Sequence, residues 1–326
     1  MTQARSIQLT EFGVPDVMRL ATLDLPDPVA GEVQLRQTAI GFNYIDIYQR
    51  MGKYPLPTPT GLGHEAAGVV EVLGTGVTDL QVGDHVVYMN AGVGAYADRR
   101  NVPAPKLVKI PAGISDEDAA AVFFKAMTVQ YLVKKTYAVQ PGDVVLVHAA
   151  AGGVGLILCG WAKALGATVI GTAGSAAKCA LAIEAGADAC IDYTQTEWVN
   201  QVVAATGGRK AHVVYDSVAA HTFMGSLDCT APFGMVVLFG AASGPAPAFD
   251  PELLNKKGCL FLTRPSVFPH NADAASFRAN AADVFAAMAS GAVKATIGAR
   301  FTLAQLPDAH RAAEARQTTG SIVITP

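Results

Sequence analysis

The stretch that decides the fold is VVLVHAAAGGVGLI, residues 144–157, in which an apolar run leads directly into glycines and then into a second apolar segment. The first four residues predict a parallel strand that is buried on both faces. Ala150-x-Gly152-x-x-Gly155 fits the fingerprint of a dinucleotide-binding turn, with alanine at its first position. Gly152 would let the backbone approach the phosphates, Gly155 would let helix and strand pack closely, and the helix start would receive negative charge. The cofactor-binding residues predicted in this turn are Gly152, Gly153 and Val154. The alternative is an ordinary glycine-rich turn.

The residues after the turn indicate which form of the cofactor binds. No Asp or Glu occurs between Val144 and Ile183, although an NAD site usually places an acid about 20 residues after the fingerprint. The segment Gly174-Ser175-Ala176-Ala177-Lys178 instead follows a second apolar strand, Thr168 to Thr172. Its hydroxyl, backbone donors and cation suit a 2′-phosphate, and one lysine within about 4 Å contributes ~1 to ~4 kcal/mol. This composition predicts NADPH; the alternative for Lys178 is a solvated helix lysine.

Length and composition exclude several classes of protein. The chain has 326 residues, 51% of them hydrophobic and 16% charged, which indicates two domains with large buried cores. The net charge of −3 and the absence of long basic runs argue against nucleic acid or a membrane surface as a partner. We expect no signal peptide and no membrane span, because the uncharged run from Val144 to Ala162 contains the glycine turn. All five cysteines follow the fingerprint at irregular spacings, which predicts no disulfides and a cytoplasmic location.

The pattern of strands and helices changes along the chain. Short strand signals separated by Gly and Pro (6–10, 33–39, 66–73 and 85–88) predict a mostly β domain up to about residue 125. A helix with Ser115 as its cap is expected to link this domain to the next. Strands then alternate with helices at 144–147, 168–172, 189–192, 212–215, 235–239 and 260–262, which predicts a doubly wound parallel sheet. Helices near 281–290 and 307–316 and a strand at 321–325 fit neither pattern.

Several motifs carry a resemblance to a known family. Gly63-His64-Glu65-Ala66-Ala67-Gly68, HAAAGGVG at 148–155 and Val214-Tyr-Asp-Ser-Val218 resemble the medium-chain dehydrogenase/reductase superfamily. GFNYID at 41–46, KAMT at 125–128 and LTRPS at 262–266 are similar to its NADPH:quinone oxidoreductase, or zeta-crystallin-like, branch. The resemblance implies an α/β fold: a Rossmann-type doubly wound parallel sheet inserted into a GroES-like, mostly β catalytic domain. It places the catalytic domain at residues 1–125 and 267–326, and the NADPH-binding domain at 126–266.

The superfamily also contains zinc alcohol dehydrogenases, in which a histidine of the GHE motif binds the metal together with two cysteines. Here no cysteine precedes Cys159, and Asn43 stands at the position that resembles the first zinc cysteine. A neutral amide is a poor zinc ligand. We therefore expect no metal, and we expect His64 and Glu65 to be structural.

Without a Lewis acid, the substrate should already be electrophilic. We predict hydride transfer from NADPH to an ortho- or para-quinone in a cleft between the domains. The alternative within enzymes is reduction of the double bond of a 2-alkenal or enone. A crystallin-like structural role or RNA binding is the alternative from another class. The apolar strand 260–262 could extend the sheet across a homodimer.

The resemblance also implies roles for individual residues. Asn43, Tyr48 and Tyr54 are the predicted catalytic residues, since an amide or phenol can hydrogen-bond a developing oxyanion. The predicted cofactor contacts outside the glycine turn are Asn43, Tyr54, Lys125, Thr128, Gly174, Ser175, Lys178, Tyr193, Ser217, Phe239, Gly240, Arg264 and Arg316. Loop packing is the alternative for the tyrosines, a surface salt bridge for Lys125 and a solvated helix position for Arg316. We interpret His148 as a core strand residue, not a proton shuttle.

Overall fold

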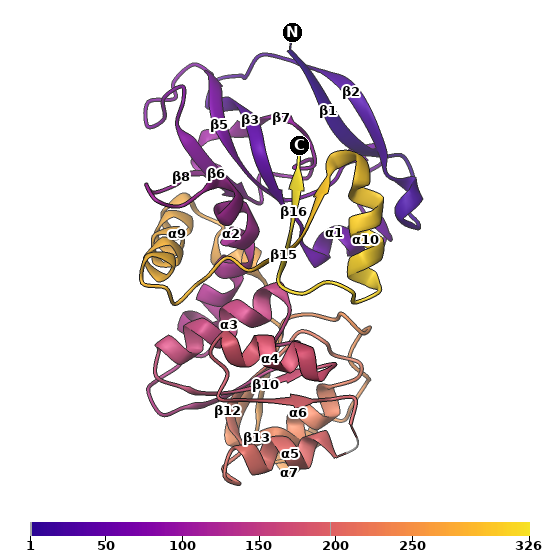
Figure 1. Ribbon diagram of the computed structural model, residues 1–326, viewed down its shortest axis with the longest axis vertical. Coiled ribbons are helices and arrows are strands. Elements are labelled where there is room, and N and C mark those ends of the chain that lie inside the picture. The colour runs from indigo at the N-terminus through magenta and orange to yellow at the C-terminus, as the bar shows by residue number, and fades with distance from the viewer. Residues whose placement is uncertain (1, 196) are drawn as a thin grey trace. The chain divides into compact units, whose positions relative to one another are not determined.

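The computed structural model describes residues 2–195 and 197–326, and these divide into two compact units (Figure 1). One unit, called the β-rich unit below, contains the chain up to Lys125 together with Asn271–Phe285 and Ala295–Pro326. The other, called the parallel-sheet unit, contains Ala126–His270 and Ala286–Lys294. The domain limits that the resemblance implies stay a prediction.

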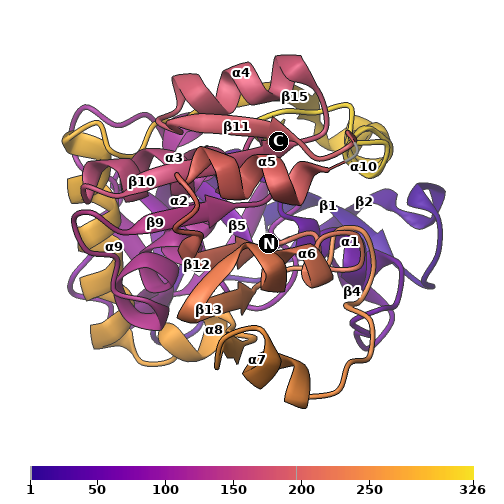
Figure 2. The same ribbon diagram turned by 90° about the horizontal axis from the view of Figure 1, so that it is seen from below.

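The parallel-sheet unit is built on six strands in the order β11-β10-β9-β12-β13-β14, and every neighbouring pair is parallel. The part of this order from β11 to β13 can be followed in Figure 2. This confirms the predicted doubly wound sheet. The last strand begins one residue later than predicted. The strands are β9 (Val144–Val147), β10 (Thr168–Ala173), β11 (Ala189–Asp192), β12 (Ala211–Asp216), β13 (Thr230–Leu238) and β14 (Phe261–Thr263).

The order of the strands reverses at β9, which carries the glycine turn at its carboxyl end. The connection through α3 leads from β9 to β10, whereas β12 pairs with the opposite edge of β9. Such a reversal opens a crevice beyond the carboxyl ends of the strands, where ligands of this architecture bind. The helices of the unit are α3 (Gly153–Ala164), α4 (Ala176–Glu184), α5 (Trp198–Ala205), α6 (Phe223–Cys229), α7 (Glu252–Lys256) and α8 (Val267–His270).

The β-rich unit combines strands from both ends of the chain, which places the carboxyl-terminal segment that fits neither sequence pattern. Its last strand, β16, pairs antiparallel with β3, with Ile324 opposite Ile40, and parallel with β15. The larger sheet has the order β15-β16-β3-β5-β6-β8, with β7 pairing to β3, and a smaller sheet has the order β2-β1-β4. The strands are β1 (Thr2–Leu9), β2 (Arg19–Leu25), β3 (Glu32–Gly41), β4 (Thr60–Gly61), β5 (Glu65–Leu73), β6 (His85–Met89), β7 (Arg99–Pro103), β8 (Leu107–Lys109), β15 (Ile297–Thr302) and β16 (Ser321–Thr325).

Four α-helices of the described chain begin in the β-rich unit. They are α1 (Tyr44–Arg50), α2 (Asp116–Tyr131), α9 (Ala274–Ala289) and α10 (Leu306–Glu314). The boundary between the units falls within α2, after Lys125. Helix α9 begins seven residues before the predicted start at 281, since Ala274 opens it. In the part of the chain that the structure describes, no helix is both long and apolar enough to cross a membrane.

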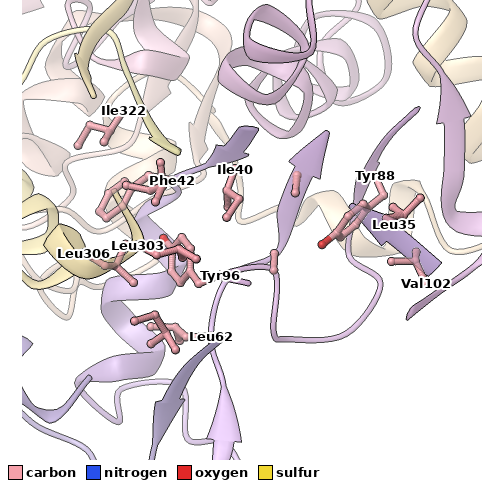
Figure 3. Packing of buried hydrophobic residues seen from close by; sticks show 14 of the residues in the cluster. Leu35, Ile40, Phe42, Leu62, Tyr88, Tyr96, Val102, Leu303, Leu306 and Ile322 are labelled. Carbon is pink, nitrogen blue, oxygen red and sulfur yellow. The ribbon is translucent and has the colours of Figure 1, made fainter. Parts of the chain in front are cut away.

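One apolar cluster forms the core of the β-rich unit (Figure 3). It joins side chains of β3, such as Leu35 and Ile40, to Leu303 and Leu306 from the carboxyl-terminal segment. Two tyrosines of the cluster are fully buried, and each hydroxyl is a donor: Tyr88 to Gln37, and Tyr96 to Asp46 at 2.7 Å. Buried hydroxyl groups require such partners, because an unpaired one would cost about 1–3 kcal/mol.

His310 of α10 is an exception to this rule. It is fully buried and packs edge-on against Phe42 at a centroid distance of 5.0 Å, but neither ring nitrogen has a hydrogen-bond partner in the described chain. Burial, together with the nearby charge of Arg50, lowers the pKa of His310 from 6.5 to about 3. The folded protein therefore holds this imidazole neutral.

Acid should destabilise the protein through His310. Below pH 6.5 the unfolded chain binds a proton on this imidazole, whereas the folded chain does not until about pH 3. The free energy of unfolding should therefore fall with decreasing pH in this window, by about 1.4 kcal/mol per pH unit. We predict that His310→Leu removes this loss. Urea unfolding at about pH 7.5 and at about pH 5 gives the free energy of unfolding of both proteins, and between these two pH values the variant should gain about 2 kcal/mol relative to the wild type. All other titrating groups are the same in both proteins, so their effects cancel in the comparison. Free energies of unfolding that change equally with pH in the two proteins would contradict the prediction.

Candidate functional site

The turn between β9 and α3 leaves the first N–H groups of the helix open. Gly152 precedes α3 as its cap, and no side chain caps the helix. Ala149 has a left-handed backbone with φ of 51°, and its carbonyl accepts a hydrogen bond from Gly152 N at 2.9 Å. A Cβ on Gly155 would lie 2.2 Å from that carbonyl oxygen, so only glycine fits there. The half-buried helix start, with Gly153 and Val154, can receive the charge of a phosphate.

The segment after β10 lies beside the end of β11. Ser175 caps α4, and its Oγ accepts a hydrogen bond from Lys178 N at 3.3 Å. A Cβ on Gly174 would lie 3.0 Å from the Tyr193 hydroxyl, so that ring covers the glycine. The structure therefore brings together Gly174, Ser175, Lys178 and Tyr193. One acid, Asp192, comes directly before Tyr193. It ends β11 and accepts hydrogen bonds from Thr194 in the turn that follows the strand.

A third group of predicted contacts lies at the carboxyl ends of β12, β13 and β14. A Cβ on Gly240 would lie 2.6 Å from the Ser217 carbonyl oxygen, so these two backbones are in close contact. Phe239 N donates to the Asp216 carbonyl at 2.9 Å. Arg264 is exposed, and its Nη1 donates to the carbonyl oxygen of Leu238 at 3.0 Å and to that of Gly240 at 3.3 Å. All the predicted contacts that belong to this unit except Thr128, which is buried on α2, thus lie beyond the same edge of the sheet.

In the β-rich unit, a buried polar cluster surrounds Glu65. Asn43 Nδ2 donates to Glu65 Oε2 at 2.8 Å, and Phe124 N donates to the other carboxylate oxygen. Lys125 Nζ lies 3.7 Å from Glu65 Oε2, and no closer hydrogen-bond partner for this ammonium is found among the described residues. Gly41 makes room for the carboxylate, because a Cβ there would lie 2.2 Å from Glu65 Oε2.

Burial works against both charges of this pair. Burial raises the pKa of Glu65, while the Lys125 ammonium and the hydrogen bonds from Phe124 and Asn43 oppose that rise. Burial lowers the pKa of Lys125, and the Glu65 carboxylate opposes that fall. Such a buried pair is strongly destabilised when one partner is removed. The surface salt bridge considered for Lys125 is therefore wrong, since its partner is fully buried.

Three tyrosines form a continuous ladder beside Asn43. The ring of Tyr48 meets those of Tyr44 and Tyr54 edge-on, each at a centroid distance of 5.4 Å. Tyr54 is 45% exposed, and Tyr54 N donates to the Tyr48 carbonyl at 3.2 Å. Burial raises the pKa of Tyr44, and the charge of Arg316 opposes that rise, which places Arg316 near the ladder.

Arg316 follows α10 with a left-handed backbone, φ 56°, and is exposed. The predicted α10 extended to this residue, but the helix ends at Glu314. Left-handed backbone is common at this place, because Arg316 N donates to Ala313 O and Gln317 N donates to Ala312 O, each at 3.0 Å, as in a Schellman ending. Arg316 therefore lies just beyond the helix and not on it, with an exposed side chain.

Sequence reasoning missed Asp46, which the structure places next to Asn43. Its Oδ2 accepts hydrogen bonds from Asn43 N at 2.9 Å and from the Tyr96 hydroxyl at 2.7 Å. Burial raises the pKa of Asp46 to about 7, and the hydrogen bonds oppose that rise. The available signal was its place three residues after Asn43, where an acid can complete a capping box.

Comparisons with known proteins agree with this arrangement. A family model described as zinc-binding dehydrogenase matches residues 153–287, and one described as alcohol dehydrogenase GroES-like domain matches residues 29–112. A quinone oxidoreductase of Pseudomonas aeruginosa is 44% identical over 324 residues, covering 99% of this chain and all of that protein. A 2-haloacrylate reductase of a Burkholderia species is 40% identical, covering 96% of each chain. The crystal structure of Escherichia coli quinone oxidoreductase complexed with NADPH is 42% identical, covers 99% of this chain and 100% of that one, and has a TM-score of 0.96.

The chain belongs to the quinone oxidoreductase branch of the medium-chain dehydrogenase/reductase superfamily. The fold and the family that the sequence motifs predict are thereby confirmed.

In this chain, the side chains at the positions that resemble the zinc ligands are hydrogen-bonded to other side chains of the protein. His64 Nε2 lies 2.9 Å from Gln49 Oε1, and the Asn43 amide is bonded to Glu65. Burial lowers the pKa of His64 to about 4. No group of three or more His, Cys, Asp or Glu residues suited to a metal ion occurs in residues 2–195 and 197–326. The donor chemistry here, with an amide and no thiolate, does not suit zinc.

Proposed function

We propose that this chain is an NADPH:quinone oxidoreductase that acts without zinc. The observation that carries the proposal is Ser175 with Lys178 beside the open glycine turn, where an NAD-specific site would place an acid. The full-length likeness to quinone oxidoreductases supports it, since one of these was crystallised with NADPH.

The described residues fit the parts of this cofactor. The amides of the glycine turn suit the pyrophosphate. Ser175, Lys178 and Tyr193 supply a hydroxyl, a cation and a phenol for the 2′-phosphate. In the β-rich unit, the ammonium of Lys125 is buried, and Glu65 is its one ionic partner among the residues that the structure describes, so it retains N–H donors for a ribose or phosphate oxygen. The dihydronicotinamide of the cofactor supplies the hydride.

Asn43 and the tyrosine ladder are proposed to act on the substrate. The bond to Glu65 uses one N–H of Asn43 and fixes the plane of its amide, which leaves the second N–H for a ligand. The hydroxyl groups of Tyr48 and Tyr54 can donate to an oxygen that gains negative charge. Because the zinc-like positions lack a thiolate, no Lewis acid polarises the substrate, which favours an acceptor that is already electrophilic, such as a quinone.

A second substrate class is favoured by one specific observation. The 2-haloacrylate reductase that is 40% identical to this chain acts, by its name, on an activated alkene. An alkene conjugated to a carbonyl group accepts hydride at carbon and gains negative charge on oxygen, so the same Asn43 and tyrosine donors would serve. Reduction of 2-alkenals or enones is therefore the alternative.

The substrate panel should separate these functions. We expect the purified protein, after exhaustive chelation, to oxidise NADPH rapidly with 1,4-benzoquinone or 9,10-phenanthrenequinone. Oxidation with a 2-alkenal should be at least tenfold slower in kcat/KM, and no oxidation of alcohols by NADP is expected. Absorbance at the NADPH band provides the measurement. A preference for the alkenal would favour the alternative, and loss of activity that only zinc restores would show that the protein depends on the metal.

The form of the cofactor should depend on Lys178. We predict that Lys178→Ala raises the Kd of NADPH about tenfold or more and leaves that of NADH nearly unchanged. A lysine ammonium within about 4 Å of the 2′-phosphate contributes about 1.4 kcal/mol or more, and NADH lacks this phosphate. Cofactor fluorescence provides both constants. Lys256→Ala is the matched control, because Lys256 is an exposed helix lysine paired with Glu252. Equal effects of Lys178→Ala on both cofactors would contradict the assignment.

A homodimer and a cytoplasmic location also remain proposals. Strand β14 lies at the edge of the parallel sheet, and Phe261 on it is 58% exposed. Such an edge can pair with that of a second copy. We predict that Phe261→Glu halves the mass measured by light scattering, whereas Phe12→Glu, at an exposed site of the β-rich unit, leaves it unchanged. A wild-type protein that is monomeric at all concentrations would contradict the dimer.

A further inference from the structure

A buried chain of hydrogen bonds runs through the parallel-sheet unit, and the proposed reaction does not use it. His148 follows β9 and is 1% exposed. Its Nδ1 lies 2.7 Å from the Thr172 hydroxyl on β10, and its Nε2 lies 3.0 Å from the Ser226 hydroxyl on α6. Ser226 Oγ in turn donates to Asp216 Oδ2 at 2.9 Å. The chain of bonds thus connects β10, β9 and β12.

The protons in this chain can be assigned from the acceptor at its end. Asp216 accepts from the Thr222 hydroxyl at 2.8 Å and from the backbone N–H groups of Val218 at 2.8 Å and Ala219 at 3.0 Å. The Ser226 hydroxyl lies 2.9 Å from Asp216 Oδ2 and 3.1 Å from the Thr222 carbonyl oxygen. A carboxylate is an acceptor only, and it is here the nearer and the stronger acceptor, so Ser226 gives it its single proton. Ser226 must then accept from His148 Nε2–H, and His148 Nδ1 must accept from the Thr172 hydroxyl. All the bonds therefore run in one direction, from Thr172 to Asp216.

The imidazole is held neutral and in one orientation. Burial lowers the pKa of His148, and the Asp216 carboxylate only partly opposes that fall. The ring of Trp198 meets the imidazole edge-on at a centroid distance of 5.5 Å. With both nitrogens bonded and Trp198 against the ring, His148 has no freedom to turn.

Each strand in this chain of bonds continues directly into a segment that the proposed function assigns to the cofactor. Thr172 precedes Gly174 and Ser175 by two and three residues, and Asp216 precedes Ser217. His148 precedes Ala149, whose carbonyl oxygen lies against Gly155. Backbone bonds follow the same path: His148 N donates to Tyr215 O at 3.1 Å, and Ala150 N donates to Thr172 O at 2.9 Å.

We propose that His148 is a positioning residue for dinucleotide binding, which sets the glycine turn, the Ser175 segment and Ser217 relative to one another through its bonds to Thr172 and Ser226. The inference rests on the proposed function. His148 touches no reacting atom and shuttles no proton. Its loss should weaken cofactor binding and leave the rate at saturating cofactor unchanged, because a displaced turn must be reordered when the cofactor binds.

Thr172→Val tests this with little change of shape, since it removes only the hydroxyl that donates to His148. We expect the Kd of NADPH, measured by cofactor fluorescence, to rise about tenfold and kcat with a quinone at saturating NADPH to stay within twofold. His148→Leu should have an equal or larger effect on Kd. Thr172→Ser, which retains a hydroxyl, should bind NADPH within threefold of the wild type.

Val236→Ala separates positioning from stability. Val236 is fully buried in the apolar core of the parallel-sheet unit, and its side chain takes no part in the chain of hydrogen bonds from Thr172 to Asp216. Val236→Ala should lower Tm as much as Thr172→Val but leave the Kd of NADPH unchanged. The proposal is overturned if Thr172→Val binds NADPH like the wild type, or if Val236→Ala weakens binding equally. A wild-type protein that binds neither NADPH nor NADH would instead overturn the proposed function, and this inference with it.

Discussion

The close approach of α3 to the end of β9 is the constraint on which the candidate cofactor site depends. It requires that Gly155 has no side chain, because a Cβ would lie 2.2 Å from the Ala149 carbonyl oxygen. Ala149 in turn has a left-handed backbone, which is costly for a residue with a Cβ. The structure thus accepts local strain to place a helix start at the carboxyl edge of the sheet, where the oriented N–H groups meet a ligand.

A second constraint lies in the β-rich unit, where the carboxyl group of Glu65 is buried among protein groups that do not suit a metal ion. Glu65 is fully buried and would be unstable without donors. Asn43 and Phe124 provide them, the Lys125 ammonium lies 3.7 Å from Glu65 Oε2 as the opposite charge, and Gly41 provides the space. The amide of Asn43 therefore has a fixed orientation before any substrate arrives. Fixed donors of this kind cost little reorganisation when charge develops on a ligand, which is why such a cluster suits hydride acceptors.

Much of the fold follows from local patterns. The six parallel strands were predictable because each is a short apolar run between glycines and helices. Strand β9 and its neighbours β10 and β12 are largely buried, whereas the edge strands β11 and β14 are partly exposed. Strand β14 and helices α9 and α10 differ from their predicted limits by one to several residues, as the ends of elements depend on packing. The short strands β2, β4, β7 and β8 were not predicted individually, because their exposed or interrupted sequences lack alternation.

The sequence by itself determined the glycine turn, the absence of an acid after it, and the absence of cysteine before Cys159, because these are matters of residue type and spacing. Only the tertiary structure decided what surrounds each residue. It buried Glu65 against Lys125, placed Arg316 near Tyr44, paired β16 with β3, and joined Thr172, His148, Ser226 and Asp216 in one chain of hydrogen bonds. These contacts connect residues that are tens to hundreds of positions apart. Their distances and proton directions arise from packing, which no local pattern encodes.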